Sequence, residues 1–333
     1  MSPRLTALLA MNSSVAALVL PPDLLERLRA TAEVDDVIVH DFADPEARRA
    51  LARTDVLISG WGCPKVDATV LADAPRLKAV IHAAGSVKGH LAPEVWDRGV
   101  MVSSAAEANA APVAQYALSA IHLAGKRAFR LASAYRGGDH QDPTTAPDIG
   151  NHGRTIGIVG ASRTGRLVLR GLAGTGRRLL VSDPFITADA ATQLGAEPVD
   201  LDTLLRESDI VSLHAPLLRE TRSLLNDRRL SLLRDGAVLI NTARGALIDT
   251  EALTRHCADG RIDAVLDVTE PEPLPAGHPL LSMGNVLVTP HLAGAMGTEI
   301  RLLGEFAVAE VERLARQVPL AGHVGATDLH RIA

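Results

Sequence analysis

Aromatic side chains are scarce in this chain of 333 residues, which contains four Phe, two Tyr and two Trp. Proteins that bind single-stranded nucleic acid stack the bases on exposed aromatic rings, so the shortage argues against that class. The formal net charge of −5 also provides no basic surface for a phosphate backbone or for anionic lipid. We therefore expect neither a nucleic-acid-binding protein nor a membrane-surface protein.

Cysteine is equally rare, since the sequence contains only Cys63 and Cys257. Neither has a neighbouring thiol at the short spacing of a zinc site, and two thiols are too few for a disulfide scaffold in a chain of this length. These features predict a cytoplasmic protein without a structural metal. Lysine is limited to four residues, so arginine carries nearly all the positive charge.

Charge is also absent from Leu5–Pro22, a run that follows Arg4 and resembles the apolar region of an export signal. The polar triplet Asn12-Ser13-Ser14 interrupts this run. We expect instead a strand over Thr6–Met11, then a turn, and then a helix over Asp23–Ala30.

Hydrophobic residues make up 47 % of the chain, which is enough for a large core, and the length favours two domains. Short apolar runs alternate with helix-like stretches, as in a parallel sheet covered by helices. The first strands are expected over Val37–Val39, Val56–Ser59, Leu77–Ile81 and Val100–Ser103, with helices or turns over Pro45–Arg53, Lys65–Ala72 and Pro93–Arg98.

A long helix over Ala105–Lys126 and an irregular surface segment over Ser133–Gly150 are expected next. A second alternation of strands and helices then begins. Its strands are expected near residues 155–159, 179–182, 196–199, 209–213, 237–241, 263–268 and 286–289. The pattern predicts an α/β fold with a doubly wound parallel sheet.

The segment TIGIVGASRTG, residues 155–165, is typical of a strand, a glycine turn and the start of a helix. Glycines in such a turn let the backbone approach a pyrophosphate at the helix N-terminus. Gly160 is expected to form the tight turn and Gly165 to allow close packing of helix on strand. Ser162 replaces the middle glycine of this pattern, and its hydroxyl would either crowd the pyrophosphate or donate a hydrogen bond to it.

Asp183 ends the next apolar run, 18 positions after Gly165. An acidic residue at this place is expected to accept hydrogen bonds from an adenosine ribose and to repel a 2′-phosphate. Alternatively, Asp183 is a turn residue before Pro184. The glycine loop and the carboxylate together favour NAD over NADP.

Three later motifs each follow a predicted strand: NTARG at 241–245, DVTEPEP at 267–273 and TPHLAG at 289–294. In this order they resemble the D-isomer-specific 2-hydroxyacid dehydrogenases, the family of glyoxylate/hydroxypyruvate reductases and phosphoglycerate dehydrogenases. The resemblance covers essentially the whole chain, and the three motifs together are highly specific.

The resemblance implies that Arg244 binds the substrate, that His291 is the acid/base and that Glu272, rather than the nearby Glu270, is the carboxylate partner of the histidine. These residue types suit the reduction of a 2-oxo acid. Histidine titrates near neutral pH, a carboxylate fixes its tautomer, and the planar guanidinium can polarise a carbonyl while holding a carboxylate. Each residue alone is also compatible with a surface ion pair, a loop charge or a capped histidine.

The resemblance also assigns the cofactor site. The residues implied to bind NAD are Gly160, Ser162, Arg163, Thr164, Gly165, Asp183, His214, Pro216, Thr221, Thr242, Ala243, Asp267, His291 and Gly294.

On the substrate side, the loop Ala83–Lys88 takes the place of the glycine-rich carboxylate loop of the family, with the N–H groups of Ala84, Gly85 and Ser86 as donors. The usual acidic residue of that loop is absent, because Val87-Lys88 stands there. Trp61 lies in another glycine-flanked loop and is either a wall of the substrate pocket or an anchor in the core.

The resemblance implies a Rossmann-type NAD-binding domain over 105–297, inserted into a smaller flavodoxin-like α/β substrate domain built from 1–104 and 298–333. A C-terminal helix over 298–316 completes the smaller domain, and a cleft between the domains is expected to close on the substrate. A homodimer is also implied, with the segment 133–150 as an arm.

These features predict an NAD-dependent D-2-hydroxyacid dehydrogenase that reduces a small 2-oxo acid such as glyoxylate or hydroxypyruvate, or runs in reverse. A formate dehydrogenase is disfavoured, because glutamine stands at the position of Glu272 in those enzymes. Two alternatives stay open: a phosphite dehydrogenase-like member, and a dinucleotide-sensing, corepressor-like binding protein with the same fold.

Overall fold

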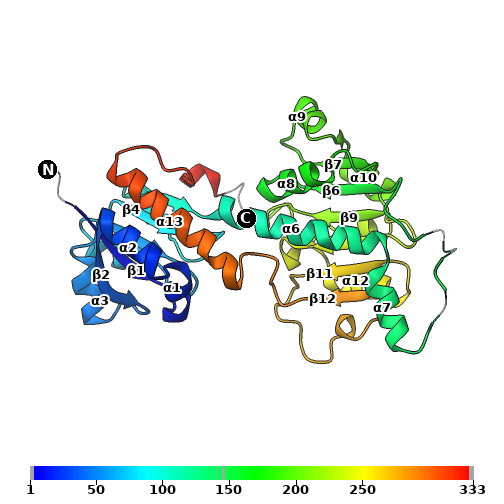
Figure 1. Cartoon of the computed structure of the whole chain (residues 1–333), viewed down its shortest axis with the longest axis horizontal. Coiled ribbons are helices and arrows are strands. Elements are labelled where there is room, and N and C mark those ends of the chain that lie inside the picture. Colours follow the sequence, from blue (N-terminus) through cyan, green and yellow to red (C-terminus); the bar gives the residue numbers. More distant parts are fainter. Residues whose placement is uncertain (1–3, 141, 145, 147, 330–333) are drawn as a thin grey trace. The chain divides into compact units, whose positions relative to one another are not determined.

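The computed structural model describes residues 4–140, 142–144, 146 and 148–329 (Figure 1). The chain divides into two compact units. Unit 1 comprises Met1–Ala110 together with Ala295–Ala333, and unit 2 comprises Ala111–Gly294. The boundaries expected from the sequence were after residues 104 and 297. The chain therefore passes from unit 1 into unit 2 within the helix Ala106–Gly125, and it returns to unit 1 for its last segment.

Within its described residues, unit 1 contains a five-stranded parallel sheet in the order β2-β1-β3-β4-β5. The strands are β1 (Leu5–Ala10), β2 (Ala32–Val39), β3 (Val56–Ser59), β4 (Ala79–His82) and β5 (Met101–Ser104). Successive side chains of a strand point to opposite faces, so Ala7 and Leu9 contribute to one core while Leu8 and Ala10 contribute to the other.

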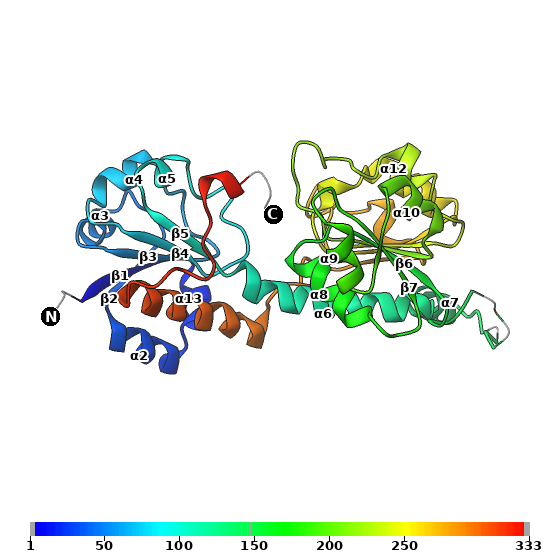
Figure 2. The same cartoon turned by 90° about the horizontal axis from the view of Figure 1, so that it is seen from above.

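Helices cover both faces of this sheet (Figure 2). One face is covered by α1 (Ser13–Val19), α2 (Pro22–Thr31) and α13 (Ile300–Ala315), and the other by α3 (Pro45–Leu51), α4 (Ala68–Asp73) and α5 (Glu94–Asp97). The C-terminal helix expected over 298–316 forms α13, and its residues Leu303, Ala307 and Val311 are fully buried against α2 and the sheet.

The prediction of a turn after the first strand was wrong, because residues 13–19 form the helix α1. The carbonyl oxygen of Asn12 accepts hydrogen bonds from the N–H groups of Val15 and Ala16 and so starts this helix. Only Ala16 and Val19 of α1 are buried. Two buried positions are too few to produce a visible helical period in the sequence.

Unit 2 contains, within its described residues, a seven-stranded parallel sheet in the order β12-β11-β10-β9-β6-β7-β8. The strands are β6 (Thr155–Val159), β7 (Arg178–Ser182), β8 (Glu197–Pro198), β9 (Ile210–Leu213), β10 (Val238–Asn241), β11 (Asp263–Leu266) and β12 (Val286–Val288). The predicted doubly wound α/β fold is thus confirmed. From β6 the chain continues to one side through β7 and β8, and it then crosses to β9 on the other side. The order of strands reverses at this point, where such sheets bind ligands.

Helices also cover both faces of the larger sheet. One face carries α6 (Ala106–Gly125), α8 (Arg163–Leu172) and α9 (Ala188–Gln193), and the other carries α10 (Leu201–Glu207), α11 (Asp227–Leu230) and α12 (Thr250–Ala258). The long helix expected over Ala105–Lys126 forms α6, which begins in unit 1 and continues into unit 2. No described helix is long and apolar enough to cross a membrane.

The segment predicted to be irregular from Ser133 onwards was partly wrong, because α7 (Ala128–Arg136) includes its first four residues. None of the residues of α7 is buried, and the helix ends directly before Gly137 and Gly138. Residues 141, 145 and 147 of this segment, and 330–333 of the C-terminal tail, lie outside the described residues.

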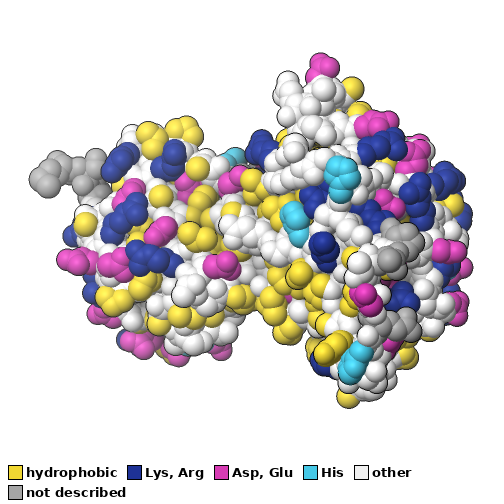
Figure 3. Space-filling model, turned by 45° about the vertical axis from the view of Figure 1, so that its right-hand side comes forward, with side chains coloured by type: hydrophobic (Ala, Val, Ile, Leu, Met, Phe, Trp, Pro, Cys, Tyr) yellow, Lys and Arg dark blue, Asp and Glu magenta, His cyan; other side chains and the backbone are white. Residues whose placement is uncertain are grey.

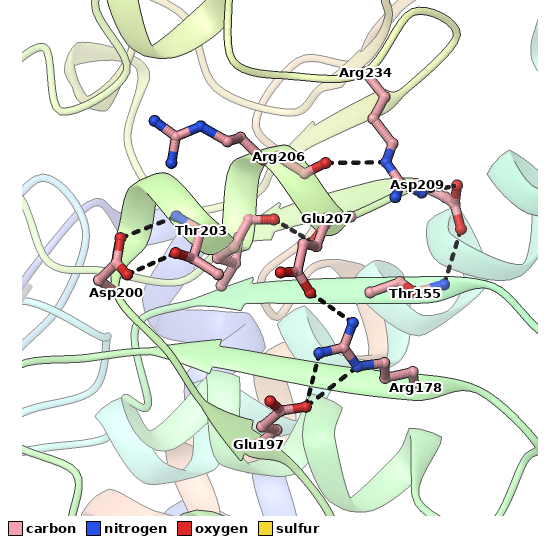
Figure 4. A network of polar contacts seen from close by, with 11 residues as sticks. Thr155, Arg178, Glu197, Asp200, Thr203, Arg206, Glu207, Asp209 and Arg234 are labelled. Atoms are coloured by element: carbon pink, nitrogen blue, oxygen red, sulfur yellow. Dashed lines mark hydrogen bonds and ion pairs between the residues drawn. The ribbon is translucent and has the colours of Figure 1, made fainter.

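Charged side chains join the amino ends of strands in unit 2 (Figure 4). The guanidinium of Arg178 at the start of β7 contacts Glu197 at 2.9 Å and Glu207 at 2.6 Å. A carboxylate oxygen of Asp209 accepts a hydrogen bond from the N–H of Thr155 at 2.9 Å. These pairs are exposed or partly exposed and each contributes little to stability. They lie at the edge of the sheet opposite the carboxyl ends of the strands. The loops of the candidate site described below follow those carboxyl ends.

Acidic and basic side chains alternate over the face drawn in Figure 3. This distribution agrees with the small net charge of the chain.

Candidate active site

The turn between β6 and α8 can be built only with glycine at two positions. Gly160 has φ of +96°, and a Cβ on it would lie 2.5 Å from the backbone nitrogen of Ala215. A Cβ on Gly165 would lie 2.1 Å from the carbonyl oxygen of Gly160. Both distances are far shorter than van der Waals contact. The loop therefore brings the N-terminus of α8 close to the end of β6, and a larger residue would fill this cradle.

Ser162 is the N-cap of α8, where its Oγ accepts a hydrogen bond from the N–H of Gly165 at 3.3 Å. Arg163 and Thr164 form the first turn of the helix. The serine that replaces the middle glycine thus stabilises the helix start by using an oxygen lone pair. Its hydroxyl hydrogen stays available to an anion at the same helix terminus.

Asp183 lies directly after β7 and connects this strand to the glycine loop. Its Oδ2 accepts a hydrogen bond from the N–H of Ala161 at 2.7 Å, and its Oδ1 accepts one from Phe185 at 2.8 Å. The second bond is that of a turn residue, one of the two interpretations of the sequence. Each carboxylate oxygen can accept a further hydrogen bond, so the turn role leaves room for a ribose hydroxyl.

Beyond β9, His214 packs against the glycine loop, since a Cβ on Gly165 would lie 3.3 Å from the His214 Cβ. The imidazole is buried and its Nε2 lies 2.9 Å from the Ser212 hydroxyl. Burial lowers the pKa of His214 to about 4, so the ring is neutral at pH 7. Thr221 donates to the carbonyl oxygen of Pro216 at 2.7 Å and thereby shapes the following turn.

The loop after β10 carries Thr242, Ala243 and Arg244. The Thr242 hydroxyl is buried and has no hydrogen-bond partner among the described residues. Such an orphaned group is uncommon in a folded protein, and a bound cofactor could satisfy it. Asn241 holds the loop by accepting a hydrogen bond from the N–H of Ala243 and donating one to the carbonyl oxygen of Arg244.

The Arg244 guanidinium donates through Nη1 to the carbonyl oxygen of Ala243 at 2.6 Å. Burial lowers the pKa of Arg244, and the nearby charge of Glu272 acts in the opposite direction. The guanidinium still carries its charge at neutral pH. Gly245 is a site residue that sequence reasoning missed: a Cβ there would lie 2.0 Å from the carbonyl oxygen of Thr269, so this glycine brings the arginine loop against the segment that leads to Glu272.

His291 and Glu272 form a close pair. The imidazole Nδ1 lies 2.5 Å from the Glu272 Oε1, and both side chains are about half exposed. The described residues offer the Nε2 atom no partner, so this nitrogen is available to a ligand. His291 has φ of +53°, a backbone conformation that is uncommon for residues other than glycine. Strained backbone of this kind is often retained where it aims a functional side chain.

Asp267 builds the turn that carries His291. The Asp267 side chain is buried and accepts hydrogen bonds from the Thr289 hydroxyl at 2.7 Å and from the N–H groups of Leu292 and Ala293 at 2.9 Å each. The Thr289 hydroxyl also contacts the Tyr116 hydroxyl at 2.8 Å. Sequence reasoning placed Asp267 beside the cofactor and missed its internal bonds, for which the threonine of TPH was the available signal.

In unit 1, the loop Ala83–Lys88 follows β4. Ala84 is buried, whereas Gly85 and Ser86 are partly exposed. The Ser104 hydroxyl donates to the carbonyl oxygen of Gly85 at 3.3 Å. Trp61 is partly buried and packs against the core beneath α1 and α13.

Comparison with known proteins supplies the family. Residues 118–293, more than half of the chain, match the model for the D-isomer specific 2-hydroxyacid dehydrogenase, NAD binding domain. A glyoxylate reductase of Thermofilum pendens is 37 % identical over 275 residues, which cover 79 % of this chain and 80 % of that protein. The chain belongs to the D-isomer-specific 2-hydroxyacid dehydrogenases.

Two further relatives of this dehydrogenase agree with the assignment. D-3-phosphoglycerate dehydrogenase of Mycobacterium tuberculosis is 35 % identical over 287 residues, which are 85 % of this chain but 52 % of that protein. The crystal structure of the TT0316 protein from Thermus thermophilus is 31 % identical, with a TM-score of 0.75, and the match covers 96 % of this chain and all of that one.

The dehydrogenase is therefore an NAD-dependent oxidoreductase that acts on CH–OH groups, and residues 118–293 within unit 2 form its NAD-binding domain. The glycine cradle and the unpartnered Thr242 hydroxyl are the features of this domain that fit a bound dinucleotide. Among the described residues, no group of three or more His, Cys, Asp or Glu side chains could hold a metal ion.

Proposed function

We propose that this dehydrogenase reduces a small 2-oxo acid such as glyoxylate or hydroxypyruvate to the D-2-hydroxy acid, and also runs in reverse. The observation that carries the proposal is the contact of 2.5 Å between the His291 Nδ1 and Glu272, with the Arg244 guanidinium on the neighbouring loop. The similarity to a glyoxylate reductase supports the substrate class.

Each side chain has a distinct task in this reaction. NADH supplies the hydride that reaches C2 of the substrate. The His291 Nε2 donates the proton that the carbonyl oxygen takes up, and in the reverse direction it accepts that proton. The Glu272 carboxylate keeps the Nδ1 protonated and stabilises the imidazolium. Arg244 polarises the carbonyl and stabilises the charge that develops on its oxygen.

The proposal assigns the cofactor contacts to unit 2. The N–H groups at the start of α8, with Ser162, Arg163 and Thr164, hold the pyrophosphate, and Asp183 holds the adenosine ribose. The residues assigned to the nicotinamide half are His214, Pro216, Thr221, Thr242, Ala243, Asp267, His291 and Gly294. The internal bonds of Thr221 and Asp267 give these two residues a shaping role in addition.

The loop Ala83–Lys88 is assigned to the substrate carboxylate. The backbone N–H groups of Ala84, Gly85 and Ser86 are the donors, and Trp61 serves as a wall of the substrate pocket. Backbone donors recognise the carboxylate that all 2-oxo acids share. Discrimination among these acids therefore depends on the groups that meet the rest of the substrate.

A panel of 2-oxo acids tests the proposed function. Purified protein is mixed with NADH and each acid, and oxidation of NADH is followed at about 340 nm, while NADH binding is measured separately by fluorescence. We expect turnover of glyoxylate or hydroxypyruvate. Binding of NADH without turnover of any acid would contradict the proposal and favour the alternative of a dinucleotide-sensing protein. Reduction of NAD by phosphite would favour the other alternative.

The role proposed for Asp183 predicts a change in coenzyme preference. The variant Asp183→Asn keeps the shape of the side chain but removes the charge that repels a 2′-phosphate. We expect the ratio of NADPH affinity to NADH affinity to rise about tenfold, or about 1.4 kcal/mol, as measured by fluorescence titration of both coenzymes.

The matched control is Asp189→Asn in the first turn of α9, where the carboxylate lies outside the glycine loop. This control is expected to bind both coenzymes as the unmodified protein does. An unchanged preference in Asp183→Asn would reduce the role of Asp183 to its two internal hydrogen bonds.

We further propose that the protein acts as a homodimer in the cytoplasm. The apolar side chains of Leu131 and Tyr135 on α7 are exposed, as is Leu281 across the adjoining groove, and this face supports self-association. Both cysteines are free, which agrees with a reducing compartment.

A further inference from the structure

Two histidines in unit 1 stand at the two ends of the loop Ala83–Gly89, and their rings meet at its base. His82 is the last residue of β4, and His90 follows the loop. The ring centroids lie 4.3 Å apart, with an angle of 37° between the planes. Neither ring belongs to the proton-donating machinery of unit 2. This contact between the two imidazoles joins the two ends of a loop of seven residues.

A serine on the neighbouring strand holds both rings. Ser59, the last residue of β3, is fully buried. Its Oγ lies 3.0 Å from the His82 Nδ1 and 3.5 Å from the His90 Nε2. Its carbonyl oxygen also accepts a hydrogen bond from the N–H of Ala83 at 2.7 Å. Side chain and backbone of one residue thus anchor the start and the end of the loop.

The His82 ring reaches into the loop as well, because it forms a hydrogen bond with the backbone of Ser86. Burial and the neighbouring His90 lower the pKa of His82 to about 3, and burial lowers the pKa of His90 to about 4. At neutral pH both rings are uncharged, so they pack without repulsion. A neutral imidazole has one donor and one acceptor nitrogen, which matches the two partners of His82, Ser59 and the loop backbone.

Burying the Ser59 hydroxyl and the His82 ring, with the partly buried His90 ring beside them, costs desolvation free energy that apolar residues in the same places would not. The hydrophobic clusters on both faces of the unit 1 sheet are mainly aliphatic. Packing alone would therefore be served by valine or leucine at these positions. Hydrogen bonds are directional and apolar packing is not, so these bonds fix the orientation of the backbone that they hold.

We propose that Ser59, His82 and His90 form a clasp that fixes the loop Ala83–Gly89 in the shape that presents its N–H groups to the carboxylate of a 2-oxo acid. The three are positioning residues, and the inference rests on the proposed function for the identity of the ligand. A clasp of this kind acts on substrate binding, because the loop holds the carboxylate equally in the ground state and in the transition state.

The variants Ser59→Ala and His90→Gln test the clasp. The first removes the hydroxyl that holds both rings, and the second removes the ring contact while keeping a polar side chain. For both we expect the KM for the 2-oxo acid to rise about tenfold, with kcat and the Kd for NADH changed less than about twofold. We also expect hydrogen exchange of the loop amides to accelerate about tenfold, confined to residues 83–89.

The matched control is His40→Gln, which breaks another serine–histidine contact in unit 1, the exposed pair of Ser13 and His40 at 2.8 Å. This control is expected to change neither KM nor loop exchange. Unchanged KM and unchanged exchange in the two clasp variants would overturn the inference. Acceleration spread over all of unit 1 would also overturn it, since that result indicates a general role in stability.

The two proposals fail differently. If the unmodified protein turns over no 2-oxo acid, the proposed function is wrong and the carboxylate assignment falls with it. Hydrogen exchange needs no substrate, so it decides even then whether the clasp holds the loop. If the unmodified protein is active and the clasp variants match it in both KM and loop hydrogen exchange, the proposed function stands and the clasp is wrong.

Discussion

Replacing His291 by asparagine is expected to lower kcat for 2-oxo acid reduction by about 10²–10⁴-fold while NADH still binds. Asparagine is shorter than histidine and cannot transfer a proton near neutral pH. The loss should appear in kcat and in kcat/KM to a similar extent, because protonation of the carbonyl oxygen occurs only in the transition state. Steady-state kinetics and fluorescence titration of NADH measure the two quantities separately.

The two glutamates of the EPEP segment provide a matched pair of controls for this prediction. Glu272→Gln removes the charge 2.5 Å from the His291 Nδ1 and is expected to reduce kcat, though less than loss of the imidazole itself. Glu270→Gln alters only a surface contact with Arg222 at 3.5 Å and is expected to leave kcat unchanged. Full activity of the His291 variant, or equal effects of the two glutamine variants, would contradict the assignment of the acid/base pair.

Replacing Arg244 by lysine is expected to lower kcat/KM for the 2-oxo acid by about 10²–10³-fold. Lysine keeps the positive charge but loses the planar fork that can contact a carbonyl and a carboxylate at once. Lysine also has a single side-chain nitrogen, whereas the guanidinium can donate through Nη1 to the carbonyl oxygen of Ala243 and contact a ligand with its other nitrogens. The Kd for NADH is expected to stay within about twofold, because the substrate contacts and not the dinucleotide contacts are changed.

Arg222→Lys is the control for this substitution, since Arg222 is exposed and pairs only with Glu270 among the described residues. Its kinetics should equal those of the unmodified protein. If Arg244→Lys keeps more than about a third of the original kcat/KM, a point charge suffices at this position, and the proposed bidentate role of the guanidinium is wrong.

The strands of unit 2 were largely predictable from the sequence. All seven strands of unit 2 lie within a few residues of their predicted places. Six of them contain a short apolar run, whereas β8 consists of the exposed residues Glu197 and Pro198. The short helix α1 and the exposed helix α7 were not predictable. α1 buries two residues and α7 buries none, so little apolar burial marks either helix.

The residues of the candidate site were likewise only partly predictable from the sequence. Motifs point to residue types that chemistry requires, and for this reason Arg244, Glu272 and His291 could be proposed as catalytic residues from the sequence. The contacts of the residues that hold the site have no such signature, even where the residue lies in a motif, as Thr289 and Gly245 do. Thr289 and Tyr116 act through a chain of hydroxyl contacts to Asp267, and Gly245 acts by the absence of a side chain. Their partners are far away along the chain, so only the folded structure brings them together.

The sequence by itself determined the family, the order of the motifs and the residue types available for hydride and proton transfer, because these depend on local spacing and on side-chain chemistry. Only the tertiary structure decided that the Glu272 carboxylate meets the His291 Nδ1, that Ser162 caps a helix and that Ser59, His82 and His90 gather beneath one loop. Contacts between distant segments depend on which strands become neighbours in a sheet, as β3 and β4 do here.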